Sequence, residues 1–187
     1  MTVDREAAER AIATFLTALG HDPRKNPELA ETPARVTEAF EKDLLDGYGV
    51  DVAALLHAES SPLGPAGPHG LVVVRDIQLT TMCPHHLLPG LGVAAVAYLP
   101  GEAIVGIGTL ARVVEAFSHR LTLQESIGEN TVRALIDHAG ARGAYCRLEF
   151  RHSCLEARGA RKHGATVVTV ARAGMSISDG AMFGGIP

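Results

Sequence analysis

The order of apolar patterns after residue 70 places the strongest constraint on the fold. Residues 71–74 and 93–99 are short runs rich in β-branched side chains, as is typical of strands. Two segments with helical periodicity follow, and residues 145–150 and 165–171 return to strand character. This order predicts an α+β domain over residues 71–174, in which two helices cover one face of an antiparallel sheet.

Apolar side chains three or four residues apart mark the two predicted helices of this domain. The stripe of the first helix is Leu110, Val113, Val114, Phe117 and Leu121. The weaker stripe of the second helix is Ile127, Thr131, Leu135 and His138.

Residues 1–58 are predicted to form an N-terminal helical region. One amphipathic helix spans residues 6–19 and ends at Gly20, and a second begins at Thr32 with a proline in its first turn. Its inward stripe is Val36, Phe40 and Leu44, and Gly47 closes it. Residues 59–70 are rich in proline and glycine, which predicts a linker without regular structure. Residues 175–187 are predicted to be a flexible tail.

The composition is that of a soluble globular protein, with 47% apolar and 20% charged residues. A net charge of −4 and the absence of tryptophan disfavour a nucleic-acid partner. No apolar run is long enough for a membrane span, and the charged N-terminus lacks a signal segment. Three cysteines without an export signal favour metal binding or catalysis over disulfides, so we expect a cytoplasmic protein.

A C-x-x-H step just after a strand, between the first two predicted strands of the domain, predicts two metal ligands. Cys83 and His86 are three residues apart, a spacing at which a thiolate and an imidazole bind one tetrahedral zinc ion. By itself this spacing is weak evidence for a metal site, because a chance occurrence or a pair of buried core residues would explain it equally well. A second, independent element is therefore needed.

That second element lies at the end of the third predicted strand. In residues 145–155 every second side chain faces the same way, which places His152 and Cys154 together at the end of an apolar row. The pattern would also fit if His152 and Cys154 were ordinary core residues. Together with the C-x-x-H step, however, the pattern favours a zinc site made of Cys83, His86 and Cys154.

Three protein ligands leave one position for water, whose pKa zinc lowers towards neutrality. An imidazole is the side chain best suited to move protons near neutral pH, and His85 and His152 remain beside the predicted metal. We therefore predict that these two histidines are catalytic. Cys146, farther back on the strand, is predicted to be a buried core thiol.

Taken together, these motifs resemble the GTP cyclohydrolase I family over most of the chain. The segments that carry the resemblance are 31–35 (Glu-Thr-Pro-Ala-Arg), 74–77 (Val-Arg-Asp-Ile), 83–89 (Cys-Pro-His-His-Leu-Leu-Pro), 97–100 (Ala-Tyr-Leu-Pro), 110–114 (Leu-Ala-Arg-Val-Val), 120–125 (Arg-Leu-Thr-Leu-Gln-Glu), 152–154 (His-Ser-Cys) and 157–159 (Ala-Arg-Gly). The resemblance implies a tunnelling fold whose subunits close into barrels and stack as a homodecamer. It also implies conversion of GTP to 7,8-dihydroneopterin triphosphate with release of formate, at sites between subunits.

By the same resemblance, each candidate residue acquires a role. The zinc ligands and the two catalytic histidines match those predicted above. Gln124 and Glu125 match the residues that hold the guanine ring, and the carboxylate can accept from both donors on one guanine edge. Arg112 and Arg158 match residues that contact the triphosphate, for which a guanidinium fork is suited.

The sequence departs from the family pattern at the phosphate end. The family usually has Gly-Leu-Ser-Lys where this chain has Gly106-Ile107-Gly108-Thr109, so a cation is lost. Arg161 or Lys162 compensates for it or simply lies in a solvated turn. The alternatives to GTP turnover are therefore a related zinc cyclohydrolase acting on a modified or less phosphorylated purine nucleotide, and a non-catalytic pterin- or nucleotide-binding homologue.

Overall fold

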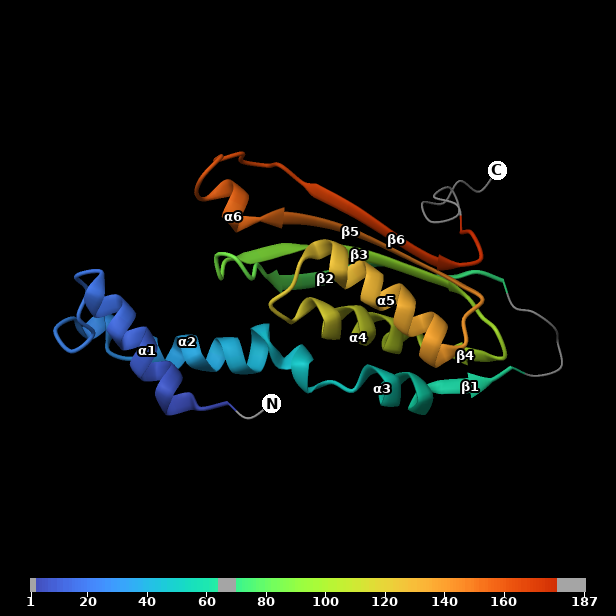
Figure 1. The fold of residues 1–187 in the computed structure, drawn as a ribbon, viewed down its shortest axis with the longest axis horizontal. Helices are drawn as coiled ribbons and strands as arrows, with labels where there is room; N and C mark the ends of the chain where they lie inside the picture. The colour runs from blue at the N-terminus through green and yellow to red at the C-terminus, as the bar shows by residue number, and fades with distance from the viewer. Residues whose placement is uncertain (1–2, 64–69, 178–187) are drawn as a thin grey trace.

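A four-stranded antiparallel sheet forms the centre of the computed structural model, which describes residues 3–63 and 70–177 (Figure 1). The strand order is β2-β3-β5-β6. The strands are β2 (Val72–Met82), β3 (Pro89–Leu99), β5 (Gly143–His152) and β6 (Val167–Gly174). The alternation read from residues 145–150 is confirmed in β5, because Cys146, Leu148 and Phe150 are all fully buried on one face.

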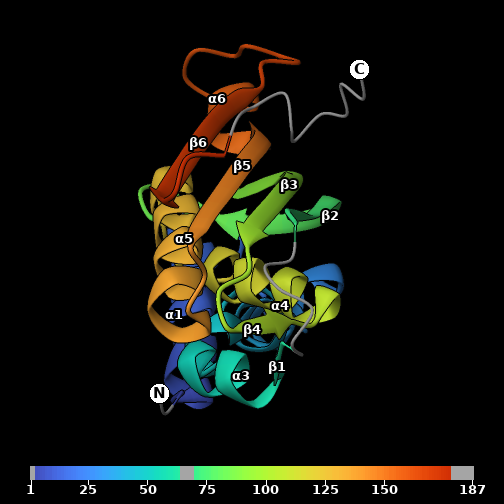
Figure 2. The ribbon, with the colours of Figure 1, turned by 90° about the vertical axis from the view of Figure 1, so that its right-hand side faces the viewer.

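Two helices, α4 (Ile107–Ser118) and α5 (Gln124–Ala139), lie on the same side of this sheet (Figure 2). Their apolar stripes supply much of the core: Leu110, Val113, Ile127 and Leu135 are all fully buried. Gly140, in the left-handed conformation, ends α5. The predicted α+β class, with two helices on one face of an antiparallel sheet, is confirmed.

The register of the sheet sets the position of the site. Met82, the last residue of β2, pairs with Pro89, the first residue of β3. Gly90 in turn pairs with His152, the last residue of β5. The β2–β3 loop and the chain that leaves β5 are therefore neighbours at one end of the sheet.

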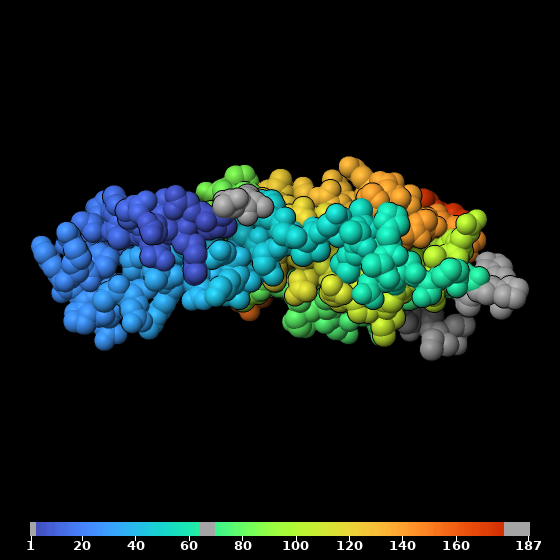
Figure 3. Space-filling view, turned by 90° about the horizontal axis from the view of Figure 1, so that it is seen from below, coloured from blue at the N-terminus to red at the C-terminus, as the bar shows by residue number. Residues whose placement is uncertain are grey.

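A third helix, α3 (Val52–Ala58), belongs to the core of the main domain, although the sequence grouped it with the N-terminal region. Val52 and Leu56 are buried within the same apolar cluster as α4 and α5. Figure 3 shows the α3 segment lying against the segments of α4 and α5 on this face of the molecule.

The predicted linker contains regular structure at its start. β1 (Ser60–Pro62) pairs antiparallel with β4 (Ala103–Val105), so the prediction that residues 59–70 hold no regular element is wrong there. The proline lies at the end of the short strand, where a missing N–H is tolerated. Residues 64–69 of the predicted linker lie outside the described residues.

The N-terminal helices form an arm at one end of the molecule (Figure 3). Its elements are α1 (Arg5–Ala18), η1 (Pro27–Leu29), α2 (Thr32–Ala39), a π-helical turn η2 (Phe40–Leu44) and η3 (Asp46–Gly49). The two predicted helices are confirmed, except that regular α-helix ends at Ala39 and π-helical turns continue the second one. No residue of α1 is buried, and Phe15 and Leu19 are each 60% exposed.

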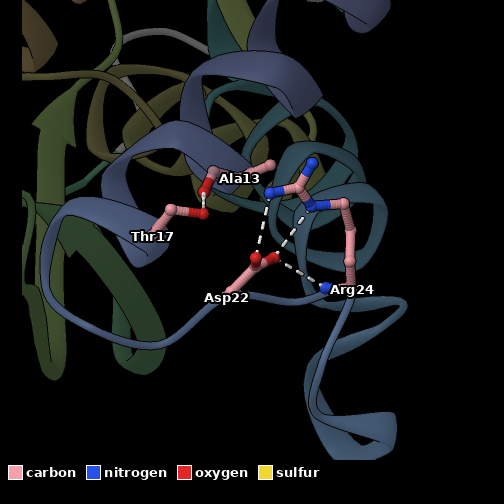
Figure 4. A network of polar contacts seen from close by, with 4 residues as sticks. All are labelled: Ala13, Thr17, Asp22 and Arg24. Carbon is pink, nitrogen blue, oxygen red and sulfur yellow. Dashed lines mark hydrogen bonds and ion pairs between the residues drawn. The ribbon is translucent and has the colours of Figure 1, made fainter.

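A local polar network shapes the turn after α1 (Figure 4). Arg24 donates from Nε and Nη2 to the two carboxylate oxygens of Asp22, at 3.0 and 2.9 Å. These bonds, and one from the backbone N–H of Arg24, lower the pKa of Asp22 to about 2. Thr17 donates its hydroxyl to the carbonyl of Ala13, one turn earlier in α1.

The chain after β6 packs back on the sheet. Ile177 is buried against Tyr145, Ala95 and Ala97, on the face opposite α4 and α5. The first residues of the predicted flexible tail are thus in contact with the core, and residues 178–187 lie outside the described residues. None of the helices in the described ranges combines the length and the apolar character that a membrane crossing requires.

Candidate metal centre

The loop between β2 and β3 positions the first two candidate ligands. The N–H of Cys83 donates to the carbonyl of Leu88 at 3.0 Å, and the N–H of Leu87 donates to the carbonyl of Cys83 at 2.9 Å. Leu87 adopts a left-handed conformation with φ 51°, which closes the turn. Nδ1 of His86 consequently lies 3.6 Å from Sγ of Cys83.

Cys154 reaches the site by a route different from the predicted one. The strand alternation ends at His152, and residues from Ser153 onward form a short helix, α6 (Ser153–Glu156). Cys154 therefore lies in a helical turn rather than in the apolar row. The turn nonetheless brings its sulfur to the β2–β3 loop: the ligand atoms of Cys83, His86 and Cys154 all lie within 4.8 Å of one another.

The α6 turn is held in place by an ion pair. Arg151 donates from Nε and Nη2 to a carboxylate oxygen of Glu156, at 3.0 and 2.8 Å. The same oxygen accepts from the backbone N–H of Gly164 at 2.8 Å, so Glu156 ties the end of β5 to the loop before β6.

The chemistry of the three donors fits a zinc ion. Partial burial, followed by the nearby Cys83 thiol, raises the pKa of Cys154, because two thiolates at this separation repel each other. A divalent cation between the sulfurs removes that repulsion and favours both thiolates. Two sulfurs and one imidazole are a ligand set that zinc prefers. The group can therefore hold a metal ion.

Arg158 and His85 lie against this group. Nη1 of Arg158 lies 2.7 Å from Nε2 of His86, so the guanidinium lies on the side of the imidazole away from Cys83. Nδ1 of His85 is 3.9 Å from the sulfur of Cys83, and the ring of His85 is exposed.

His152 lies at the same end of the sheet, in a half-buried position. Its Nε2 is 2.8 Å from Oε1 of Gln124. Burial lowers the pKa of His152, and the carboxylate of Glu125 opposes that shift. The ring is therefore predominantly neutral near pH 7, the state in which it can accept a proton.

Gln124 and Glu125 begin α5 but face different surroundings. Glu125 is exposed in the first turn of the helix. Gln124 is only 4% exposed, and both ends of its side-chain amide bond to groups of this chain. The structure thus leaves Glu125 accessible to a ligand, whereas the amide of Gln124 is already hydrogen-bonded within the protein.

Arg112 is the one candidate residue that the structure does not bring to this end of the sheet. Its guanidinium lies 3.9 Å from the carboxylate of Glu59, between α3 and β1. Those elements lie at the end of the molecule opposite the β2–β3 loop and α6 (Figure 1).

Gly90 is a site neighbour that the sequence analysis missed. A Cβ atom at this position would lie 3.0 Å from Nδ1 and 3.3 Å from Cε1 of His152. Its only sequence signal is a glycine inside a strand, which indicates a close approach without naming the partner. The partner became visible only through the pairing of β3 with β5.

A cation site with three protein ligands, two of them thiols, differs from the closed four-ligand sites of structural zinc. Within the described ranges the ligand cluster has only these three members, and two further histidines lie at the same end of the sheet. Such an arrangement is typical of a metal-dependent hydrolase.

Comparison with known proteins identifies the family. The family model described as GTP cyclohydrolase I matches residues 8–183. A protein named GTP cyclohydrolase 1 from Leifsonia xyli is 42% identical over 171 residues, covering 91% of this chain and 87% of that protein. Its namesake from Chromobacterium violaceum is 43% identical over 174 residues, covering 91% and 81%. The chain belongs to the GTP cyclohydrolase I family and is a hydrolase of that type.

Proposed function

We propose that the protein is a zinc-dependent GTP cyclohydrolase, which converts GTP to 7,8-dihydroneopterin triphosphate with release of formate. The observation that carries the proposal is the convergence of Cys83, His86 and Cys154 within 4.8 Å, beside two histidines that are not in the ligand group. Membership of the family supports the same reaction. This activity belongs to folate and pterin synthesis, and we place the protein in the cytoplasm.

Each residue of the proposed site has a separate role in binding or catalysis. Glu125 accepts hydrogen bonds from the ring N–H and the amino group of guanine, because its exposed carboxylate offers two acceptor oxygens. Arg158 holds a phosphate oxygen with its guanidinium fork. Cys83, His86 and Cys154 would hold a zinc ion, which would supply the Lewis acidity that makes water a nucleophile near neutral pH.

His85 and His152 move the protons of the reaction. Water attacks C8 of guanine while one of the two imidazoles protonates a nitrogen of the five-membered ring, which then opens. A second hydrolysis releases formate, and rearrangement of the ribose allows the pterin ring to close. A neutral His152 is suited to take a proton from the attacking water.

We further propose that active sites form between subunits of a homodecamer built from barrels. Arg112 supports this, since it lies at the opposite end of its own subunit and reaches a site only in another copy. The sheet supports it as well. Among the described strands β2 and β6 are edges, and pairing between copies satisfies their free backbone groups.

A second candidate function is the same type of hydrolysis acting on a purine nucleotide that is modified or has fewer phosphates than GTP. It is favoured by the first turn of α4, where Gly108 and Thr109 replace the serine and lysine usual in the family. Thr109 is only 4% exposed and carries no charge, so this turn offers no cation to a phosphate.

The test is incubation of zinc-loaded protein with GTP, with formate and the fluorescent oxidised pterin as readouts. We expect both products, and loss of both in the His152→Ala variant with zinc still bound. His138→Ala is the matched control, because His138 is an exposed histidine at the other end of α5. Full formate release by the His152 variant would disprove the mechanism. Equal turnover of GTP, GDP and guanosine would favour the second candidate.

A further inference from the structure

The side chain of Gln124 is fully engaged within the protein. Its amide nitrogen lies 3.2 Å from the carbonyl of Leu148, 3.0 Å from the carbonyl of Val167 and 3.1 Å from the hydroxyl of Thr169. Its oxygen lies 2.8 Å from Nε2 of His152. With 4% of its surface exposed, the residue has no polar atom left for a ligand.

These contacts fix which way the amide points. Two backbone carbonyls can only accept, so the side that faces Leu148 and Val167 must be the NH₂ group. The oxygen therefore faces His152 and can only accept from it. It follows that Nε2 of His152 carries a hydrogen, and Nδ1 is the nitrogen that remains to exchange a proton.

The opposite side of the His152 ring lies against Gly90. A Cβ atom there would lie 3.0 Å from Nδ1 of His152 and 3.2 Å from Cγ2 of Thr81, closer than side chains normally pack. The ring is thus held between the amide of Gln124 and the bare backbone of β3. Each neighbour restricts a different movement of the ring. The hydrogen bond to the amide of Gln124 fixes its rotation, and contact with the backbone of β3 limits how closely it approaches the sheet.

We propose that Gln124 is a positioning residue for His152: it selects the Nε2–H tautomer and aims the ring, with Gly90 as the surface against which the ring rests. The inference rests on the proposed function, in which His152 carries a proton of the reaction. It assigns Gln124 a role different from contact with guanine, which the resemblance implied. The two roles make opposite kinetic predictions.

The first test is the Gln124→Leu variant, which keeps the volume but removes both ends of the amide. We expect kcat to fall about 100-fold, as for other losses of catalytic orientation, with the KM for GTP little changed. In ¹⁵N-histidine solid-state spectra of the zinc-loaded protein, the His152 signals should change from distinct protonated and unprotonated nitrogens to a tautomer mixture. A raised KM with unchanged kcat and unchanged spectra would overturn the inference in favour of guanine contact.

Two further variants keep the inference testable if Gln124→Leu does not fold. Gly90→Ala approaches the ring from the other side and should give the same loss of kcat, with Gln124 intact. Thr169→Val is the matched control: the amide nitrogen has two hydrogens and retains two carbonyl acceptors, so kcat and spectra should stay close to wild type. Normal kcat and spectra in Gly90→Ala would contradict the proposed positioning of the His152 ring between Gln124 and Gly90.

His152→Ala separates the failure of this inference from failure of the proposed function. If that variant keeps full activity, the proposed function fails. If it is inactive while Gln124→Leu and Gly90→Ala turn over GTP normally, only the positioning role fails. Zinc content and oligomer size are measured for every variant, so that a change in kcat is compared between equally assembled proteins.

Discussion

The three cysteines of this chain have different chemistry because their surroundings differ. Cys83 and Cys154 are partly exposed and lie in the ligand group. Cys146 is completely buried in the core, and burial raises the pKa of its thiol to about 12. At neutral pH Cys146 thus stays protonated, and a protonated buried thiol neither binds metal nor reacts.

The metal ligands can be tested by single substitutions. Cys83→Ala and Cys154→Ala are each expected to abolish stoichiometric zinc binding, since each removes one of three ligands. Cys146→Ala is the control and should retain zinc. Bound metal is measured by its release to a chromogenic chelator after thiol modification. Retention of zinc in Cys154→Ala would show that the ligand set is wrong.

The burial of His152 gives metal-free protein a defined pH dependence. The unfolded chain binds the proton of this histidine near its ordinary pKa of about 6.5, whereas the folded chain binds it only at lower pH. The stabilising contribution is thus present above that ordinary value and is lost as the pH falls towards the folded pKa.

Denaturant unfolding at pH 8 and at pH 5.5 tests this dependence. The free energy of unfolding of metal-free protein should fall less on acidification in His152→Asn than in wild type. His138→Asn, with an exposed histidine replaced, should follow wild type. An equal fall in all three proteins would contradict the expected effect.

At the scale of elements, the structure depends on the contact between the N-terminal arm and α4. The carbonyl of Gly47, in η3, accepts from Nη2 of Arg120 at 3.0 Å. Asp46 lies 2.7 Å from Nδ1 of His119. These contacts join the arm to the end of α4, and the absence of a side chain at Gly47 permits the close approach.

Two neighbouring glycines provide a matched test of this junction. A Cβ atom at Gly47 would lie 2.3 Å from the carbonyl oxygen of Ala116, whereas one at Gly49 would have nothing within 4 Å. Gly47→Ala should therefore lower the free energy of unfolding by about 1–3 kcal/mol, a typical cost of overpacking. Gly49→Ala should be close to neutral. Equal stability of both variants, measured by denaturant unfolding, would refute the expected clash.

At the scale of the whole molecule, the candidate residues occupy two ends. The ligand group, His152 and Glu125 lie at one end of the sheet, and Arg112 lies with Glu59 at the other. A single subunit cannot place both sets around one small substrate. The distribution is what we expect of a protein whose site is completed by another copy.

Complementation between variants tests that arrangement. Arg112→Ala and His152→Ala should each have low activity alone, and co-assembly of the two should restore activity in about a quarter of the sites under random mixing. Mixtures of His85→Ala and His152→Ala serve as the control, because both histidines lie at the same end of one subunit, and no site regains both. Failure of the first mixture to recover would place Arg112 outside the shared site.

The features that could be predicted from the amino-acid sequence are those that rest on interactions between neighbouring residues. The C-x-x-H step follows β2 as predicted, and α1, α2, α4 and α5 follow the apolar stripes, because periodicity and turn residues act over a few neighbouring positions. Cys146 and the apolar row of β5 were also correctly placed in the core.

The features that could not be predicted are those that depend on contacts between segments far apart in the chain. Cys154 joins the ligands from α6 rather than from the strand, and only the packing of β5 beside β3 sets Gly90 against His152. The sequence could not separate the neighbours Gln124 and Glu125, of which one is buried and the other exposed. The position of Arg112 far from the metal ligands follows from the direction of α4 along the sheet, since a helix places its side chains by packing and not by motif.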